Sequence, residues 1–225
     1  MADAQAREKI LGAFLTLLAE KRFERIELSE VAQLANVSLA DLRGEFGSTF
    51  DMVAAFMRET DKKVLSGGEQ LQLDPELADQ SARDRLFEVL MRRFEALSPH
   101  REAVRSLYRS ARTSPQLAMG LNKLAVRSQQ WMLSSAGIGS SGLVGGMRAQ
   151  ALAGFFAKAM QTWLDDEDPG LARTMASLDR QLASAERLAG FAREMCRFVP
   201  GCGPRRRRSQ RDVAFPEDPN APVAV

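Results

Sequence analysis

Few residues in this sequence have the types and spacing that catalysis requires. The single histidine, His100, follows Pro99, and no serine, cysteine or carboxylate is spaced to be its partner in acid–base chemistry. The GxSxG, P-loop and dinucleotide-binding glycine patterns are also missing from the sequence. We therefore predict no catalytic residues and no enzymatic activity, and we interpret His100 as a surface or helix-capping residue.

Metal-binding patterns are equally scarce. Cys196 and Cys202 have no histidine nearby, which excludes a disulfide scaffold and a standard zinc pattern. The acidic run Asp165, Asp166, Glu167 and Asp168 could ligate a hard cation, but it lacks the alternate spacing and the glycine of a calcium loop. We expect no metal and no cofactor. Instead, Asp166 or Asp168 is predicted to begin a helix, where carboxylates are favoured.

The composition determines the expected fold class. Among 225 residues, 45% are hydrophobic and 27% charged, which excludes a wholly disordered chain. Only three isoleucines and six threonines occur, so strand-favouring residues are rare and an all-α protein is predicted. The sequence has no apolar stretch long enough to cross a bilayer and begins with no apolar signal segment. We expect a cytoplasmic location.

The first 66 residues have the pattern of short successive helices. Apolar spacing predicts a helix from about residue 5 to 21 and a short second helix that ends at Asn36. Ser38 and Asp41 have the spacing of a capping box, which predicts the start of a third helix. Ser48 is expected to cap a longer fourth helix. Two short helices joined by a tight turn indicate a helix-turn-helix.

Core and cap positions run from Val31 through Leu42 to Ser48, and by these positions the region resembles the TetR family of transcriptional regulators over roughly residues 5–63. The resemblance implies a TetR-like fold, with a small three-helix helix-turn-helix domain and a larger helical ligand-binding and dimerisation domain. It also implies a one-component regulator that binds operator DNA. The matching core and cap positions are Val31, Ala32, Ala35, Val37, Ser38, Leu42, Phe46, Gly47 and Ser48. The residues that the resemblance places at the DNA are Ser38, Leu39, Arg43, Ser48 and Thr49.

The chain differs from the family at several of these positions. Arg43 stands where the family has an aromatic residue, Gly44 and Glu45 replace a basic or aromatic pair, and Thr49 replaces a lysine. Residues 1–66 hold nine Lys and Arg against eleven Asp and Glu, a net charge of −2. Because phosphates repel acidic surfaces, we predict weak, salt-dependent DNA binding that depends most on Arg43. A helix-turn-helix kept only as a scaffold is the alternative.

A second helical domain is predicted over residues 67–199, after a connector marked by Gly67, Gly68, Asp74 and Pro75. We expect it to bind a small apolar or lipid-like ligand between its helices, although a filled core would give the same spacing. A homodimer is predicted through the helix at about residues 143–164 and the one after it. Its small residues are Gly145, Gly146, Ala149, Ala153 and Ala157. The ligand-lining candidates are Phe87, Leu90, Phe94, Leu107, Tyr108, Leu121, Leu124 and Trp131.

The second half contains a series of residues, among them Pro99, His100 and Trp163, by which it also resembles ubiquinone-biosynthesis accessory proteins of the coenzyme Q9 type. That resemblance implies the alternative function, a non-catalytic lipid-binding protein of quinone biosynthesis that has lost DNA binding. A Gly/Ser loop at residues 134–142 replaces the aromatic-rich middle segment of that family. The matching residues are Arg93, Pro99, His100, Arg101, Trp163, Leu164, Asp165, Asp166, Thr174, Leu178, Asp179 and Arg180.

The C-terminal part of the sequence is basic. Residues 187–199 combine an apolar stripe with arginines, a pattern compatible with peripheral membrane contact but also with packing on the core or on a second subunit. Residues 200–225 are predicted to be a disordered tail. Within it, the Arg205–Arg208 block could contact phosphates or could serve only solubility.

Overall fold

The computed structural model describes residues 2–69 and 81–198, and every regular element in these ranges is a helix. The predicted all-α class is therefore confirmed. By its internal contacts the chain divides into two units, Met1–Arg187 and Leu188–Val225. The helix-packing contacts described below lie within the first unit. In the described ranges, none of the helices combines the length and apolar character that crossing a bilayer requires.

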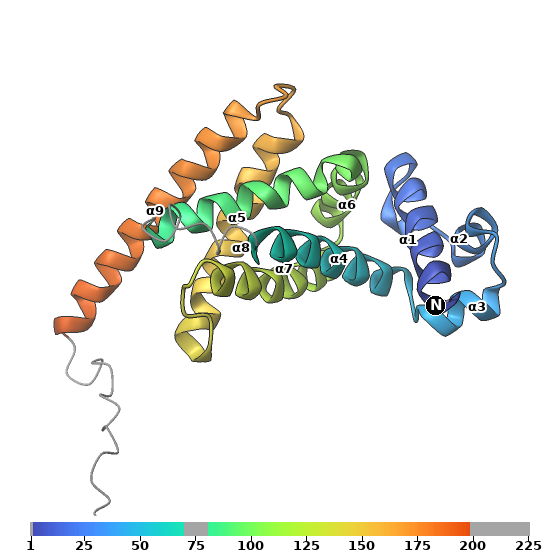
Figure 1. Ribbon diagram of the computed structural model, residues 1–225, viewed down its shortest axis with the longest axis horizontal. Coiled ribbons are helices and arrows are strands. Elements are labelled where there is room, and N and C mark those ends of the chain that lie inside the picture. The colour runs from blue at the N-terminus through green and yellow to red at the C-terminus, as the bar shows by residue number, and fades with distance from the viewer. Residues whose placement is uncertain (1, 70–80, 199–225) are drawn as a thin grey trace, which may run out of the picture. The chain divides into compact units, whose positions relative to one another are not determined.

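Helices α1 (Ala2–Glu20), α2 (Leu28–Ala35) and α3 (Leu39–Glu45) pack around one apolar centre (Figure 1). A 3-10 turn, η1 (Phe23–Arg25), joins α1 to α2. The apolar spacings that predict these helices correspond to their buried faces. Side chains with at most 4% exposure in this centre are Ile10, Phe14, Leu18, Val31, Ala32, Leu42 and Phe46.

Local hydrogen bonds set the ends of α2 and α3. Asn36 ends α2 in the left-handed conformation, with φ 54°. Ser38 Oγ accepts from the Asp41 amide at 3.0 Å, and the Asp41 carboxylate accepts from the Ser38 amide at 3.2 Å. This confirms the predicted capping box. Because Leu42 is also buried, the start and one face of α3 are both fixed against α1 and α2.

Helix α4 (Thr49–Glu69) leads from this group to run beside α5 (Ala82–Leu97) and α7 (Pro115–Ser135), as Figure 1 shows. It extends through Gly67 and Gly68, which the sequence indicates as a connector. Glycine costs only about 1 kcal/mol in a helix, and burial of Val64 against the neighbouring helices offsets that cost. The helix therefore ends later than predicted.

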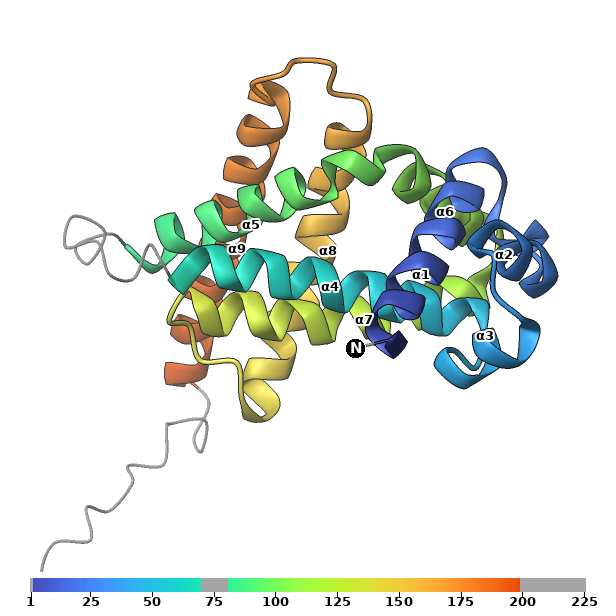
Figure 2. The ribbon, with the colours of Figure 1, turned by 45° about the vertical axis from the view of Figure 1, so that its right-hand side comes forward.

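Helix α6 (Arg101–Thr113) follows a 3-10 turn, η3 (Ser98–His100), and packs against α1 (Figure 2). Ser106 Oγ donates a hydrogen bond to the Lys21 carbonyl at 2.7 Å. The Phe23 amide donates to Ser110 Oγ at 3.2 Å. Two serines on one face of α6 thus hold the segment that connects α1 to α2.

Helix α8 (Gly142–Leu164) packs along α7, and α9 (Ala172–Phe198) follows it. The start and end of α8 agree with the sequence prediction. Ala149 and Ala153 are buried within the single chain, so these small residues serve packing inside it. Gly145 is required locally, because a Cβ there would lie 2.1 Å from the backbone carbon of Ser140.

Aromatic side chains fill the space between α5 and α8. The rings of Phe94 and Phe156 stack with centroids 4.7 Å apart, and the Trp163 ring lies 5.6 Å from Phe94. Phe94 and Trp163 are completely buried. This cluster fixes the C-terminal half of α8 against α5, and therefore also the position of the turn that follows α8.

Some predictions concern parts of the chain outside the described residues. These are the connector at Asp74 and Pro75, the side chains from residue 188 onward, and the tail at residues 200–225 with Arg205–Arg208. The expected membrane contact of residues 187–199 therefore stays a prediction. So do the proposed domain limits of 1–66, 67–199 and 200–225.

Candidate functional site

Helix α3 presents a polar outer face on a buried anchor. Leu42 is 2% exposed and faces α1 and α2, whereas Ser38, Leu39 and Arg43 are exposed. Leu39 is 56% exposed. Three of the five residues expected at DNA therefore share one solvent-facing surface at α3.

The other two, Ser48 and Thr49, lie at the start of α4 and are half-buried. Ser48 Oγ accepts from the Asp51 amide at 3.2 Å, which confirms the predicted cap. A Cβ on Gly47 would lie 2.6 Å from Asp51 Oδ2 and 3.3 Å from Arg43 Nη1. The structure therefore brings Arg43 of α3 close to the first turn of α4, and Gly47 leaves the space for it.

Glu45 is paired with a residue that sequence spacing could not indicate. Arg7 Nη1 lies 3.4 Å from Glu45 Oε2 and donates to the Glu45 carbonyl at 3.2 Å. The Arg7 guanidinium also lies 4.4 Å from the centroid of the Phe46 ring. These contacts neutralise part of the negative charge that Glu45 would otherwise present beside Arg43.

The residues expected to line an apolar cavity occupy different environments. Leu90 and Phe94 are completely buried, whereas Trp131 is 58% exposed. Partly buried residues packed against the core are Phe87, Leu107, Tyr108, Leu121 and Leu124. The apolar cavity expected between the helices of the second domain stays a prediction. Of its eight expected lining residues, Phe87 lines the cleft described next.

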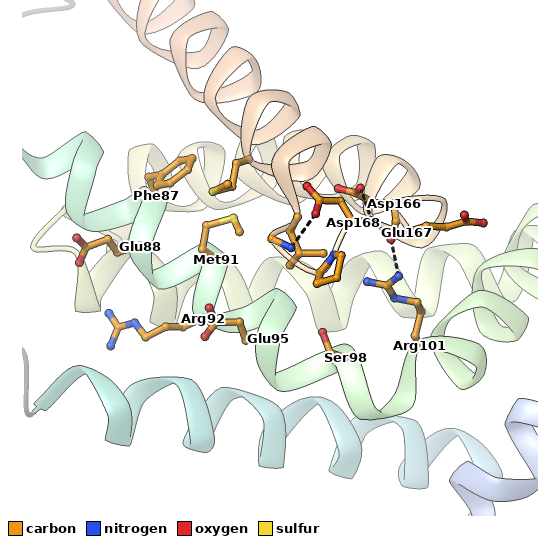
Figure 3. A pocket seen from close by; sticks show the side chains of 14 residues that line it. Phe87, Glu88, Met91, Arg92, Glu95, Ser98, Arg101, Asp166, Glu167 and Asp168 are labelled. Carbon is orange, nitrogen blue, oxygen red and sulfur yellow. Dashed lines mark hydrogen bonds between the residues drawn. The ribbon is translucent and has the colours of Figure 1, made fainter.

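A cleft of about 860 Å³ lies between α5, the turn that joins α8 to α9, and the start of α9 (Figure 3). Phe87 and Met91 of α5 form one apolar wall, and Leu171 and Met175 form the other. The charged residues that line it are Glu88, Arg92, Glu95, Arg101, Asp166, Glu167 and Asp168. The volume falls within the range of small-molecule sites in proteins.

Asp166 organises the turn that forms one side of this cleft. Its carboxylate is 1% exposed and accepts hydrogen bonds from the Thr174 amide at 2.8 Å and the Thr174 hydroxyl at 2.7 Å. Burial raises the pKa of Asp166, but the hydrogen bonds from Thr174 and Asp168 outweigh it and leave the pKa below its usual value. Asp166 is therefore ionised at neutral pH.

Two further residues hold the same turn. Asp168 accepts from the Gly170 and Ala172 amides at 3.0 and 3.2 Å, so the expected role of the acidic run at a helix start is confirmed. Arg101 donates to the Asp166 carbonyl at 2.7 Å, and its guanidinium lies 4.7 Å from the centroid of the Trp163 ring. The turn is thereby attached to α6.

His100 lies at the N-cap position of α6, but its side chain makes no capping hydrogen bond. Its ring packs edge-on against Phe56, with centroids 5.3 Å apart. Burial and the nearby charge of Lys63 lower the pKa of His100. Among the described residues, no group of three His, Cys, Asp or Glu side chains is placed to hold a metal ion.

Sequence reasoning missed Arg7, Met91, Glu95 and Met175. Their partners or neighbours lie far away in the chain, as with Arg7 and Glu45, which are 38 residues apart. One signal was available, because Phe87, Met91 and Glu95 follow one another at four-residue spacing and so share one face of α5.

No protein-family model and no curated protein matches this sequence. Solved structures do match. A TetR transcriptional regulator from Nitrosomonas europaea has a TM-score of 0.62 and 20% identity, with 80% of this chain and 98% of that one covered. A TetR regulator from Rhodococcus sp. RHA1 has a TM-score of 0.54 and 18% identity, covering 83% and 98%.

A tetR-family regulator from Streptomyces coelicolor also matches, with a TM-score of 0.54, 16% identity and 85% of each chain covered. At these identities the likeness establishes the fold. The chain therefore has the TetR fold, as its N-terminal motif predicts.

Proposed function

We propose that this protein is a transcriptional regulator that binds operator DNA as a homodimer and responds to a small ligand. The observation that carries the proposal is the outer face of α3, where Ser38, Leu39 and Arg43 are exposed above the buried anchor Leu42. A short helix held in this way by a preceding helix has the geometry that enters a DNA major groove. The matching structures from Nitrosomonas europaea and Rhodococcus sp. RHA1 are those of TetR transcriptional regulators, which supports the proposal.

Arg43 and the start of α4 have complementary functions in this proposal. The Arg43 guanidinium can reach a guanine edge or a phosphate. Ser48 and Thr49 stand at the N-terminus of a 21-residue helix, where the helix dipole favours a phosphate. Arg43 would then contribute to base reading, and the start of α4 would fix the position of the protein on the backbone.

Control by a ligand requires a mechanical connection between the two helical regions. Ser106 and Ser110 of α6 bond the segment between α1 and α2, while α4 continues from the helix-turn-helix into contact with α5 and α7. A ligand that binds more tightly when α6 or α4 is in one position than when it is in another favours the first position. In a dimer, that shift changes the distance between the two recognition helices.

A mobility-shift titration against the DNA upstream of the protein's own gene, at two salt concentrations, tests the proposal. We expect retardation that weakens sharply as salt rises, and a larger loss for Arg43→Ala than for any other single change in residues 1–66. Arg58→Ala is the matched control, because Arg58 is an exposed cation further along α4.

Absence of retardation at low salt, or wild-type binding by Arg43→Ala, would overturn the DNA-binding proposal. The lipid-binding accessory function suggested by the second half of the sequence would then become the leading hypothesis. Binding of a quinone lipid by the full chain would test it directly.

A further inference from the structure

We propose that the cleft between α5 and the α8–α9 turn is a binding site for a small lipophilic cation. This inference rests on the proposed function, because it assigns the effector of the regulator to a defined place. It differs from the apolar cavity expected between the helices, since the lining of the cleft is both apolar and acidic.

The first argument is the charge of the cleft. Five carboxylate residues and two arginines line it, which gives a net formal charge of −3. Asp166 stays ionised because hydrogen bonds from Thr174 hold its pKa below the usual value. An anion would meet net repulsion on entering this site, whereas a cation would be attracted.

The two arginines of the lining occupy different places, Arg101 at the α8–α9 turn and Arg92 on the side of α5 toward α4. Arg101 donates to the Asp166 carbonyl and lies over the ring of Trp163. Arg92 extends away from the Asp166–Asp168 turn (Figure 3), and its Nη1 lies 3.9 Å from where a Cβ on Gly67 of α4 would be. The net charge of −3 already includes both guanidiniums, of which that of Arg92 has its Nε and Nη1 buried without a hydrogen-bond partner among the described residues.

Glu95 is the carboxylate best placed to receive a cation. It is exposed, and its side chain has no hydrogen bond or ion pair within residues 2–69 and 81–198. By contrast, Asp166 and Asp168 are occupied by the amides at the start of α9. In Figure 3 the Glu95 side chain lies next to Met91 and Arg92 on α5.

The apolar part of the ligand is specified by the same face of α5. Phe87, Met91 and Glu95 are spaced four residues apart, so an aromatic ring, a thioether and a carboxylate follow one another along the helix. Met175, which is 38% exposed, and Leu171 face them from the other wall. Methionine and phenylalanine suit apolar cations, because both combine apolar surface with polarisable electrons.

Binding of a ligand in the cleft would affect the position of the helix-turn-helix through α6. Arg101 and Arg105 of α6 bond the backbone and side chains at the end of α8, including Asp165 Oδ1 at 3.0 Å from Arg105. Ser106 and Ser110, on the same helix, bond the α1–α2 segment. A ligand that displaces the α8–α9 turn therefore acts on the helix that holds the DNA-binding region.

Calorimetric titration of the full chain without DNA tests the inference, with tetraphenylphosphonium as the probe. Tetraphenylborate, which has the same shape and the opposite charge, is the matched control. We expect the phosphonium to bind at one site per chain and the borate to show no binding. Since DNA is absent, the outcome is independent of whether the protein binds an operator.

Variants locate the site. Glu95→Gln should weaken phosphonium binding about tenfold, and Glu95→Lys should abolish it. Glu24→Gln, which removes an exposed carboxylate of η1, should leave the affinity unchanged. Because Glu95 is exposed, neither change disturbs the core, and circular dichroism checks the fold of each variant.

Methionine methyl resonances give a second readout that needs no substitution. The Met91 and Met175 methyl signals should shift on addition of the phosphonium, whereas that of Met52, in the N-terminal core, should not. Three results would overturn the inference: no binding of the phosphonium, equal binding of the borate, or unchanged affinity in both Glu95 variants.

Discussion

Glu45 illustrates how one ion pair alters the charge of the exposed face of α3, the surface that we propose binds DNA. Its carboxylate lies 3.4 Å from Arg7 Nη1, so the two charges partly cancel beside Arg43. Replacing Glu45 with glutamine removes one negative charge and leaves the Arg7 cation unpaired. We expect Glu45→Gln to strengthen DNA binding about fivefold at low salt, as measured by mobility shift.

Arg7→Ala should have the opposite effect, because it exposes the Glu45 charge. Glu24→Gln is the control for Glu45→Gln, since it changes the net charge by the same amount at a residue outside α3 and α4. If Glu24→Gln strengthens binding as much as Glu45→Gln, the effect reflects net charge and the local explanation is wrong.

The ionised form of Asp166 should contribute to stability. Its folded pKa lies below the unfolded value, so its contribution is present above the unfolded pKa near 3.8 and is lost as the pH falls through the folded pKa. We expect Asp166→Asn to lower the free energy of unfolding by about 1–3 kcal/mol at pH 7, measured by urea denaturation.

The difference between wild type and Asp166→Asn should shrink as the pH falls below 3.8, where the wild-type carboxyl takes up its proton. Glu167→Gln is the neighbouring control, because Glu167 is exposed and has no hydrogen-bond partner within the described parts of the chain. A difference that stays constant between pH 7 and pH 3 would contradict this account.

At the scale of the elements, a buried ion pair joins three helices. Asp61 of α4 pairs with Arg93 of α5 and accepts from Ser128 of α7 at 2.7 Å. Arg93 is 3% exposed and also lies 5.6 Å from the centroid of the Phe156 ring. We expect Asp61→Ala to lower the free energy of unfolding by about 3–5 kcal/mol, because it leaves a buried cation unpaired.

The exposed pair Glu59 and Lys62 provides a matched control on the same helix. Its side chains are 52% and 72% exposed, so Glu59→Ala should leave the unfolding free energy nearly unchanged. Replacing both Asp61 and Arg93 by leucine should recover much of the loss caused by Asp61→Ala. If the loss of unfolding free energy in the double variant equals the sum of the losses in the two single leucine variants, Asp61 and Arg93 are not energetically coupled.

The ends of the helices could be predicted from the sequence where they depend only on local signals such as capping residues. Ser38 and Ser48 each accept a hydrogen bond from a backbone amide in the first turn of the next helix, at the positions that their sequence context predicts. The end of α4 was predicted too early. Gly67 is recognisable in the sequence as a residue that weakens a helix, whereas the burial of Val64, which supports the helix, depends on tertiary structure.

The candidate site was predictable only in part, for a related reason. The resemblance of residues 31–48 places Ser38, Leu39 and Arg43 on one short helix, and the structure exposes all three. The cleft combines α5 with residues 166–175, and periodicity reveals the apolar face of a helix without revealing what faces it. The pairing of Arg7 with Glu45 depends on tertiary structure in the same way.

At the scale of the whole molecule, we expect a dimer with α8 at its centre. Leu143, Val144 and Met147 are 82%, 59% and 66% exposed, a concentration of apolar surface that favours association. On the same helix, a Cβ on Gly146 or Gly154 would meet no atom within 4 Å, so a second helix can approach closely there. A two-fold dimer also matches the symmetry of palindromic operators.

Light scattering at micromolar concentration should give twice the 24.8 kDa mass of the chain. Met147→Glu should raise the dimer dissociation constant at least about tenfold, because it would place an unpaired carboxylate in an apolar interface. Leu34→Glu, at a 51% exposed leucine of α2, should remain dimeric. A monomeric wild type would exclude the dimer. If Leu34→Glu dissociates the dimer and Met147→Glu does not, the interface lies at the N-terminal helices. The α8 interface would then not determine the distance between the two recognition helices, and this dimer prediction would be wrong.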